Sequence, residues 1–299
     1  MVEPLRRTEL SDAHVHLQDD RFGSDWADIE KYLTRAREAG VVRFLCAGTS
    51  PADWNRVAEI ARRFDGVLAA FGIHPWKARK VSGDWIPVLA KFLTSFVSKD
   101  GETRASLGEV GLDFAVRDLD ETERREQERV FRAQLSLANS LGVPATIHSV
   151  RANELVLKIL REYPKIPALL LHGWIATPNE IASAVETGAF FSFSARSVDP
   201  SATRGRATVA TVPRDRILLE SDGPRLLPPN GYAGAPIASP RVYLERKSAD
   251  GFLLEEPAAI LSTGREIAAI RKTPVEEFFA QLALNERRFF QAIPVKSKN

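Results

Sequence analysis

Short apolar segments alternate with longer amphipathic segments along most of the chain. The apolar segments are rich in β-branched residues and bounded by turn residues, as is typical of buried strands, and the segments between them have helical spacing. Because each interval holds one strand and one helix, the pattern predicts parallel βαβ units and an α/β fold, a closed (β/α)8 barrel of the TIM type. The eight expected strands end at His16, Thr49, His74, Glu109, His148, His172, Ser194 and Asp222.

Two amphipathic segments carry clear boundary signals. The first opens with Ser50 and Pro51, a typical N-cap and first-turn pair, and closes at Gly66. The second is a long charged segment over residues 121–142, which ends at Gly142. We interpret its charges as the solvated outer face of a helix.

The C-terminal part of the chain differs in composition from the alternating part. Residues 225–257 are rich in proline and glycine, which predicts a long loop at the carboxyl end of the barrel. Residues 256–291 predict two closing helices, the second beginning near Thr273 and Pro274. No domain boundary is recognisable, so we expect one metal-dependent hydrolase barrel domain over residues 1–299.

Composition and charge narrow the class of protein. The 299 residues are 44% hydrophobic and 27% charged, which is enough apolar material for a large core. The formal net charge of +2 lacks the basic signature of a protein that grips duplex DNA. Nucleic acid could still be bound locally through a few arginines.

The single cysteine and the apolar runs bear on cellular location. Cys46 lies in the apolar run VRFLCAG, so an internal disulfide is excluded and a buried thiol is expected. The N-terminus lacks the apolar core of a signal peptide, and no run approaches the roughly 18 apolar residues of a membrane span. We therefore expect a cytoplasmic protein without a membrane partner.

All five histidines of the chain lie at the ends of predicted strands. They are His14, His16, His74, His148 and His172. The carboxyl ends of barrel strands form one mouth, so these side chains are predicted to converge there. Glu109 and Asp222 end two further apolar strands, where a carboxylate has no packing role. Four imidazoles and two carboxylates are a typical ligand set for two divalent metals such as Zn, Mn, Fe or Co.

Each histidine also has a simpler interpretation. The pair His14 and His16 is of a kind common on exposed strands, and a single histidine at a strand end is usually a hydrogen-bonded structural residue. Independent structural histidines would be scattered over helices and loops as well, so their shared position favours one site. Strand alternation places Asp12 on the same face as His14 and His16.

A series of motifs, in the right order over nearly the whole chain, resembles that of the TatD-related metal-dependent hydrolases, often called TatD DNases. The motifs are DAHVHL (12–17), FGIHPW (71–76), GEVGLDF (108–114), IHS (147–149), LLHGW (170–174), ESDGP (220–224) and NERRFF (285–290). The resemblance implies a barrel hydrolase with two divalent metal ions, for which Mg, Mn and Zn are the candidates.

The resemblance also implies which residues bind the metals. Glu109 would bridge the two ions, in a position where related barrel hydrolases often have a modified lysine, which favours the TatD branch over the phosphotriesterase-like branch. The remaining ligands would be His14, His16 and Asp222 for one metal, and His148 and His172 for the other.

Two positions depart from the family pattern. Gly173 and Trp174 follow a histidine where members commonly have cysteine or serine and then phenylalanine. Many members carry an arginine two residues after the fifth-strand histidine, where this chain has Val150 followed by Arg151. An offset of one residue reverses the face of a strand, so we do not expect Arg151 to contact the phosphate.

A metal pair of this kind would activate a water at neutral pH and bind the oxygens of a phosphodiester. Asp222 is our candidate for accepting the proton of that water, and loss of Glu109 should be the most damaging single change. His74 has no metal in this scheme and is expected to contact the phosphate or the leaving group, with a structural hydrogen bond as the alternative. Asp12 is expected to orient a ligand, or to make a buried bond within the barrel.

Four further side chains are candidates for substrate binding. Trp76 and Trp174 could stack on a nucleobase, with packing as the alternative for both. Arg196 and Arg225 lie just beyond the seventh and eighth strands and are candidates for phosphate contacts, with a surface role as the alternative.

The leading functional hypothesis is a phosphodiesterase that acts on DNA as a 3′–5′ exonuclease at single-stranded or frayed ends. A nearly neutral chain suits end recognition better than tracking of a duplex. Hydrolysis of a small amide, ester or lactone is an alternative, because the same barrel and metals serve that chemistry. A non-catalytic metal-binding scaffold is the alternative of another class.

Overall fold

The strands form one eight-stranded sheet in which each strand pairs in parallel with the next along the chain. The computed structural model describes residues 9–81, 83–96, 105–224 and 256–293. The strands are β1 (Leu10–Val15), β2 (Val41–Ala47), β3 (Val67–Phe71), β4 (Ala105–Asp113), β5 (Ala145–Val150), β6 (Leu169–Leu171), β7 (Phe190–Phe193) and β8 (Ile217–Leu219). The predicted fold class is confirmed.

Two backbone hydrogen bonds connect the segment after β8 to β1. The amide of Asp222 donates to the carbonyl of His14 at 2.9 Å, and the amide of His16 donates to the carbonyl of Gly223 at 2.7 Å. These bonds bring the two ends of the sheet together and nearly close the barrel. They also place the residues that follow β8 directly beside the histidines of β1.

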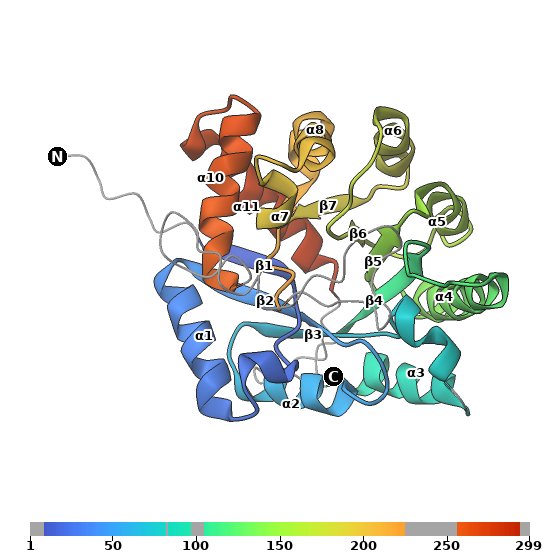
Figure 1. Ribbon diagram of the computed structural model, residues 1–299. Coiled ribbons are helices and arrows are strands. Elements are labelled where there is room, and N and C mark those ends of the chain that lie inside the picture. The colour runs from blue at the N-terminus through green and yellow to red at the C-terminus, as the bar shows by residue number, and fades with distance from the viewer. Residues whose placement is uncertain (1–8, 82, 97–104, 225–255, 294–299) are drawn as a thin grey trace.

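Helices surround the strands (Figure 1). They are α1 (Trp26–Glu38), α2 (Trp54–Arg63), α3 (Trp85–Ser95), α4 (Glu121–Leu141), α5 (Asn153–Leu160), α6 (Pro178–Glu186), α7 (Ala195–Val198), α8 (Thr203–Thr211), α10 (Ile260–Ile270) and α11 (Val275–Gln291), with 3-10 turns η1 (Asp20–Phe22), η2 (Pro75–Lys80), η3 (Arg214–Arg216) and η4 (Pro257–Ala259). The two predicted closing helices are therefore present as α10 and α11. Most of the predicted loop, residues 225–255, lies outside the described residues. No helix within the described ranges combines the length and apolar character needed to cross a bilayer.

The helix boundaries follow local capping chemistry. The predicted helix over 121–142 is α4, which ends at Gly142 with a φ of 66°. The prediction of a helix start at Ser50 is wrong by a few residues. The carboxylate of Asp53 accepts the amides of Thr49 and Ser50 at 2.9 and 3.2 Å, which folds this segment into a turn, and α2 begins only at Trp54.

Helix α11 closes the amino end of the barrel. Phe289 and Phe290 pack in an apolar cluster with strand residues such as Leu218. On the same helix, the buried carboxylate of Glu286 accepts the amide of Ser11 at 2.9 Å and its hydroxyl at 3.2 Å. The NERRFF segment therefore anchors the start of β1.

Candidate metal centre

Glu109 lies at the centre of two pairs of histidines. Its Oε1 atom is 2.7 Å from His172 Nε2 and 2.8 Å from His148 Nδ1. Its Oε2 atom is 3.4 Å from the Nε2 atoms of both His14 and His16. Each carboxylate oxygen therefore faces one histidine pair, and all five side chains are buried. This arrangement suits a carboxylate that bridges two cations.

His14 and His16 point ring nitrogens at the same place. Their Nε2 atoms are 3.2 Å apart, and two nitrogens bound to one ion at about 2.1 Å would lie roughly 3 Å apart. His16 Nδ1 is 2.8 Å from the carbonyl of Ala47, which can only accept, so Nδ1 carries the proton in the neutral ring. The Nε2 lone pair of His16 is then available to a metal. Asp222 completes this side, with Oδ1 4.0 Å from His16 Nε2.

The other pair, His148 and His172, is supported by two carboxylates behind the rings. His148 Nδ1 and His172 Nε2 are 3.2 Å apart. Asp113 Oδ2 lies 3.2 Å from His148 Nε2, on the ring edge away from Glu109. Glu220 Oε2 lies 3.8 Å from His172 Nδ1 and accepts the hydroxyl of Ser192. A carboxylate bonded as Asp113 is holds a histidine in the tautomer and orientation that metal binding requires, whereas Glu220 lies beyond hydrogen-bond distance of His172.

Sequence reasoning assigned no role to Asp113, because it placed the end of the fourth strand at Glu109. That placement is wrong, since β4 continues to Asp113. Gly111 allows this continuation because a Cβ atom there would lie 1.9 Å from the carbonyl oxygen of His148. The signal that could have identified Asp113 is the spacing of two residues that joins it to Gly111 and Glu109 within GEVGLDF.

His74 approaches Glu109 as a hydrogen-bond donor. Its Nδ1 accepts the amide of Trp76 at 3.2 Å, so in the neutral ring the proton is on Nε2, which lies 3.4 Å from Glu109 Oε1. A ring nitrogen that carries a proton cannot bind a metal. The structure thus brings His74 into the cluster in a tautomer that suits hydrogen bonding, while His74, Glu109 and His148 also place donor atoms within 4.8 Å of one another, so that His74 has no metal stays a prediction.

The cluster carries strongly shifted pKa values. Burial alone would raise the pKa of Glu109, but the charges of His74, His172 and His14 hold it well below the ordinary value. Burial lowers the pKa of His14 to about 3 and that of His74 to about 4. Burial would also lower the pKa of His172, but the charge of Glu109 raises it to about 10. Glu109 is therefore held as an anion among the histidines.

The residues around Glu109 fit divalent metal ions. Glu109 Oε2 is buried and accepts no hydrogen bond from the residues that the structure describes. Buried polar atoms are nearly always bonded, so an oxygen aimed between two ring nitrogens is suited to bind a cation. Imidazole and carboxylate donors in this number suit ions such as zinc or manganese. Three overlapping groups of the cluster have their donor atoms within 4.8 Å of one another.

Asp12 supports the site through the backbone rather than through a ring. Its Oδ1 accepts the amides of Ser221 and His14 at 2.9 and 3.2 Å, and its Oδ2 accepts the Ser221 hydroxyl at 2.6 Å. Asp12 thereby ties β1 to the segment that carries Asp222, which adopts a left-handed φ of 50°. Asp12 thus makes the buried bonds within the barrel that were the alternative interpretation, and its role in orienting a ligand stays a prediction.

Two buried glutamines of α4 hold the backbone at the ends of two strands. Gln134 accepts the amide of Ile73 at 2.7 Å and donates to its carbonyl at 3.1 Å. Gln127 makes the same pair of bonds with Asp113, at 2.8 and 3.2 Å. One glutamine therefore fixes the residue before His74, and the other fixes the carboxylate behind His148.

The two tryptophan candidates have different positions. Trp76 is partly buried, donates its indole N–H to Asp113 Oδ2 at 2.8 Å and packs edge-on against His74 at 4.3 Å. Its stacking on a base stays a prediction. Trp174 is 0% exposed and donates to Asn153 Oδ1 at 2.8 Å. The stacking role expected of Trp174 is wrong, because its ring presents no face to a substrate.

The two arginine candidates also differ. Arg196, in α7, forms an ion pair with Asp222 and lines the same cavity as Glu109. It therefore lies at the predicted place, although its present contact is a carboxylate. Arg225 lies outside the described residues. The lone Cys46 is buried, as predicted, and burial raises its pKa to about 12.

Known proteins share this chain's sequence and fold. A family model described as TatD related DNase matches residues 11–291. A 3′–5′ ssDNA/RNA exonuclease TatD from Erwinia tasmaniensis is 32% identical over 286 residues, which cover 94% of this chain and 99% of that protein. A putative deoxyribonuclease TATDN3 from Mus musculus is 30% identical over 230 residues, 73% of this chain and 74% of that one.

A solved structure bears on the fold alone. The crystal structure of YJJV, a TatD homologue from Escherichia coli, covers 95% of this chain and 98% of its own at a TM-score of 0.73 and 23% identity. Because the family model spans both β1, with its histidine pair, and α11, with its closing motif, the match includes every residue of the metal cluster. The chain belongs to the TatD-related DNase family.

Proposed function

We propose that the chain is a metal-dependent phosphodiesterase that removes nucleotides from the 3′ end of single-stranded or frayed DNA. The observation that carries the proposal is Glu109, with one buried oxygen facing His14 and His16 and the other facing His148 and His172. The exonuclease activity named for the Erwinia relative supports the choice of substrate. The single buried cysteine fits a cytoplasmic location.

Two divalent ions are the proposed cofactors, with Mg, Mn and Zn as candidates. One would be held by His14, His16 and Asp222, and the other by His148 and His172, with Glu109 between them. Such ions activate a water as nucleophile and neutralise charge that develops on phosphate oxygens.

Three side chains have proposed roles beyond holding the metals. Asp222 borders the cavity and is 8% exposed, so its carboxylate can accept the proton of the attacking water. Arg196 pairs with that carboxylate and can bind a phosphate oxygen at the same place. The Nε2 proton of His74 can be donated to a phosphate oxygen or to the leaving group.

The test is incubation of the purified protein with single-stranded DNA labelled at its 5′ end, with Mg²⁺, Mn²⁺ or Zn²⁺ and with chelator. We expect stepwise shortening from the 3′ end that depends on the metal. Turnover of a small ester without any shortening would replace the proposal with hydrolysis of small molecules. Metal binding without turnover of either substrate would identify a scaffold.

A further inference from the structure

Two wide pockets flank the metal cavity on different sides. The cavity has a volume of about 110 Å³. A pocket of about 630 Å³ beside β5 and β6 shares Ser149, Val150 and Gly173 with it. A second pocket, of about 600 Å³, lies beside η1 and α2 and shares His74 and Trp76. A strand whose scissile phosphate enters the cavity must extend into a flanking pocket.

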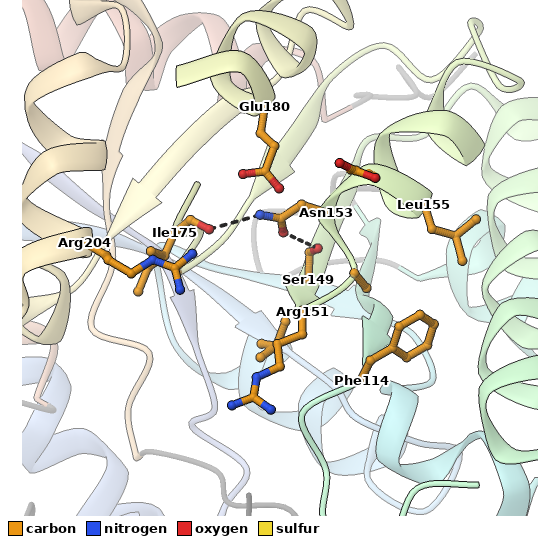
Figure 2. A pocket seen from close by; sticks show the side chains of 12 residues that line it. Phe114, Ser149, Arg151, Asn153, Leu155, Ile175, Glu180 and Arg204 are labelled. Atoms are coloured by element: carbon orange, nitrogen blue, oxygen red, sulfur yellow. Dashed lines mark hydrogen bonds between the residues drawn. The ribbon is translucent and has the colours of Figure 1, made fainter. Parts of the chain in front are cut away.

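The pocket beside β5 and β6 carries two arginines that form no ion pair within the part of the chain that the structure describes. Arg151 follows β5 in a left-handed conformation with a φ of 53° and is exposed, and Arg204 is exposed on α8. Figure 2 shows the two side chains approaching the pocket from these separate elements. Neither guanidinium forms an ion pair with a carboxylate of the described residues. Both can therefore bind an anion without breaking a contact.

The position of Arg151 refines the expectation drawn from the sequence. Val150 lines the metal cavity, but Arg151 lines only the flanking pocket. Arg151 therefore lies outside the cavity that contains Glu109 and in the pocket next to it.

Asn153 lines the pocket and is held in place by three hydrogen bonds. Its Oδ1 accepts the hydroxyl of Ser149 and the indole N–H of Trp174, both at 2.8 Å, and its Nδ2 donates to the carbonyl of Ile175 at 3.0 Å. Figure 2 shows Asn153 between Ser149 and Ile175. The buried Trp174 therefore helps to hold Asn153, a residue of the pocket lining, in place. Phe114 and the side chain of Ile175, 39% exposed, add apolar surface on which a base can lie.

The pocket also contains two carboxylates. Glu180 accepts the amide and the hydroxyl of Thr177 at 2.7 and 2.8 Å, in the capping box of α6. Glu154 is exposed at the first turn of α5. The carboxylate of Glu180 is thus bonded within the cap of its own helix. Glu154 and Glu180 both lie on different helices from Arg204.

The pocket beside η1 and α2 is less suited to a phosphate backbone. It is lined by three carboxylates, those of Asp19, Asp20 and Asp53. Its arginine, Arg56, is engaged over the Trp26 ring at 3.8 Å and donates to the carbonyl of Ser24 at 2.7 Å. With Lys77 as its second cation, this pocket has three carboxylates against two cations, whereas the pocket beside β5 and β6 has two of each, so a polyanion is less favoured on this side.

We propose that the strand retained after cleavage lies in the pocket beside β5 and β6, where Arg151 and Arg204 bind phosphates adjacent to the scissile one and Phe114 and Ile175 contact a base. The inference rests on the proposed function, because it takes single-stranded DNA as the substrate. It assigns the strand to one side of the metal cavity and excludes the other.

The test compares charge removal in the two pockets. The double variant Arg151→Gln, Arg204→Gln removes both cations while keeping side chains of similar size, and Lys77→Gln is the matched control in the opposite pocket. The substrates are a labelled thymidine oligonucleotide and the p-nitrophenyl ester of thymidine monophosphate, which has no neighbouring phosphate. We expect the double variant to raise KM for the oligonucleotide about 10-fold and to lower its salt dependence by about 0.7 per lost phosphate contact. Turnover of the small ester should stay within about twofold.

Binding gives a readout that does not need turnover. Fluorescence anisotropy of the labelled oligonucleotide, with chelator-treated protein, should show weaker binding to the double variant and unchanged binding to Lys77→Gln. Equal binding and equal KM for the double variant and the wild type would overturn the inference while leaving the nuclease activity in place. An equal loss in Lys77→Gln would overturn it as well. Failure of the wild type to shorten any oligonucleotide would instead count against the proposed function.

Discussion

Two buried glutamates, Glu109 and Glu286, lie toward opposite ends of β1 and do different work. Glu109 is 1% exposed and faces the histidines at the carboxyl end of the barrel, whereas Glu286 is 3% exposed and binds Ser11 at the amino end. Burial alone does not separate a metal site from a structural contact. The groups that surround each carboxylate distinguish the metal site from the structural contact.

The difference is visible in the direction of the two pKa shifts. Burial raises the pKa of Glu286 to about 8, because the bonds from Ser11 and the charge of Arg43 compensate only in part. Burial acts in the same direction on Glu109, but the surrounding imidazoles reverse it and hold the pKa well below the ordinary value. Glu286 is thus stable as a neutral acid, and Glu109 is suited to remain an anion beside cations.

The largest expected effect comes from replacing each glutamate in turn. Glu109→Gln should lower kcat/KM on single-stranded DNA by more than about 100-fold, because both metals lose a shared ligand. Glu286→Gln should change it by less than about threefold, since its contacts are to Ser11 at the far end of β1. Measured rates on one labelled oligonucleotide decide the matter. Equal losses in the two variants would show that burial, and not the histidine cluster, explains the effect.

Smaller effects are expected from replacing the two glutamines of α4, and the two variants should differ in which property changes. Gln127→Leu frees Asp113 and so should weaken metal binding about 10-fold. Gln134→Leu frees the backbone before His74 and should lower kcat about 10-fold with unchanged metal affinity. Each variant leaves similar buried groups unpaired, at about 1–3 kcal/mol each, so each controls for the stability loss of the other. Identical changes in metal affinity would refute distinct positioning roles.

The smallest effect is a pH dependence of stability from Glu286. The pKa of Glu286 in the folded state, about 8, exceeds the ordinary value of 4.5, so between these values the folded state holds more protons than the unfolded state. Stability therefore falls as pH rises through this window, by up to about 1.4 kcal/mol per pH unit. Glu286→Gln lacks this loss, so the variant should gain stability relative to the wild type from about pH 5 to pH 8. Urea denaturation at several pH values measures the difference, and parallel curves would contradict the assignment.

The barrel and the metal cluster could be predicted from the sequence because their signals are local. Apolar runs mark the strands, and polar residues such as His148 and Glu109 interrupt them where packing has no use for a charge. The residues that support the cluster were harder to predict. Asp113 lies beyond the expected end of its strand, and Gln127, like Gln134, acts from a helix whose charged residues are exposed or partly exposed.

The positions of Trp174 and Arg151 depend on contacts between distant segments. Trp174 follows a metal-type histidine and was expected at the mouth, but its indole turns inward to Asn153 and lies under the neighbouring pocket. Arg151 was not expected to contact the scissile phosphate, and the pocket in which we propose a role for it is formed by elements far apart in the sequence. Contacts between distant segments are what the local pattern does not contain.

The most direct test of the account is the number of metal ions bound by wild type, Glu109→Gln and Glu286→Gln protein. After removal of metal with chelator, each is titrated with Mn²⁺ or Zn²⁺ by calorimetry, and the bound metal is counted by elemental analysis. The account predicts two ions per chain in the wild type and in Glu286→Gln, and weaker or incomplete binding in Glu109→Gln. No tight binding by the wild type, or full binding by Glu109→Gln, would contradict the central claim that Glu109 joins the two histidine pairs into one metal centre.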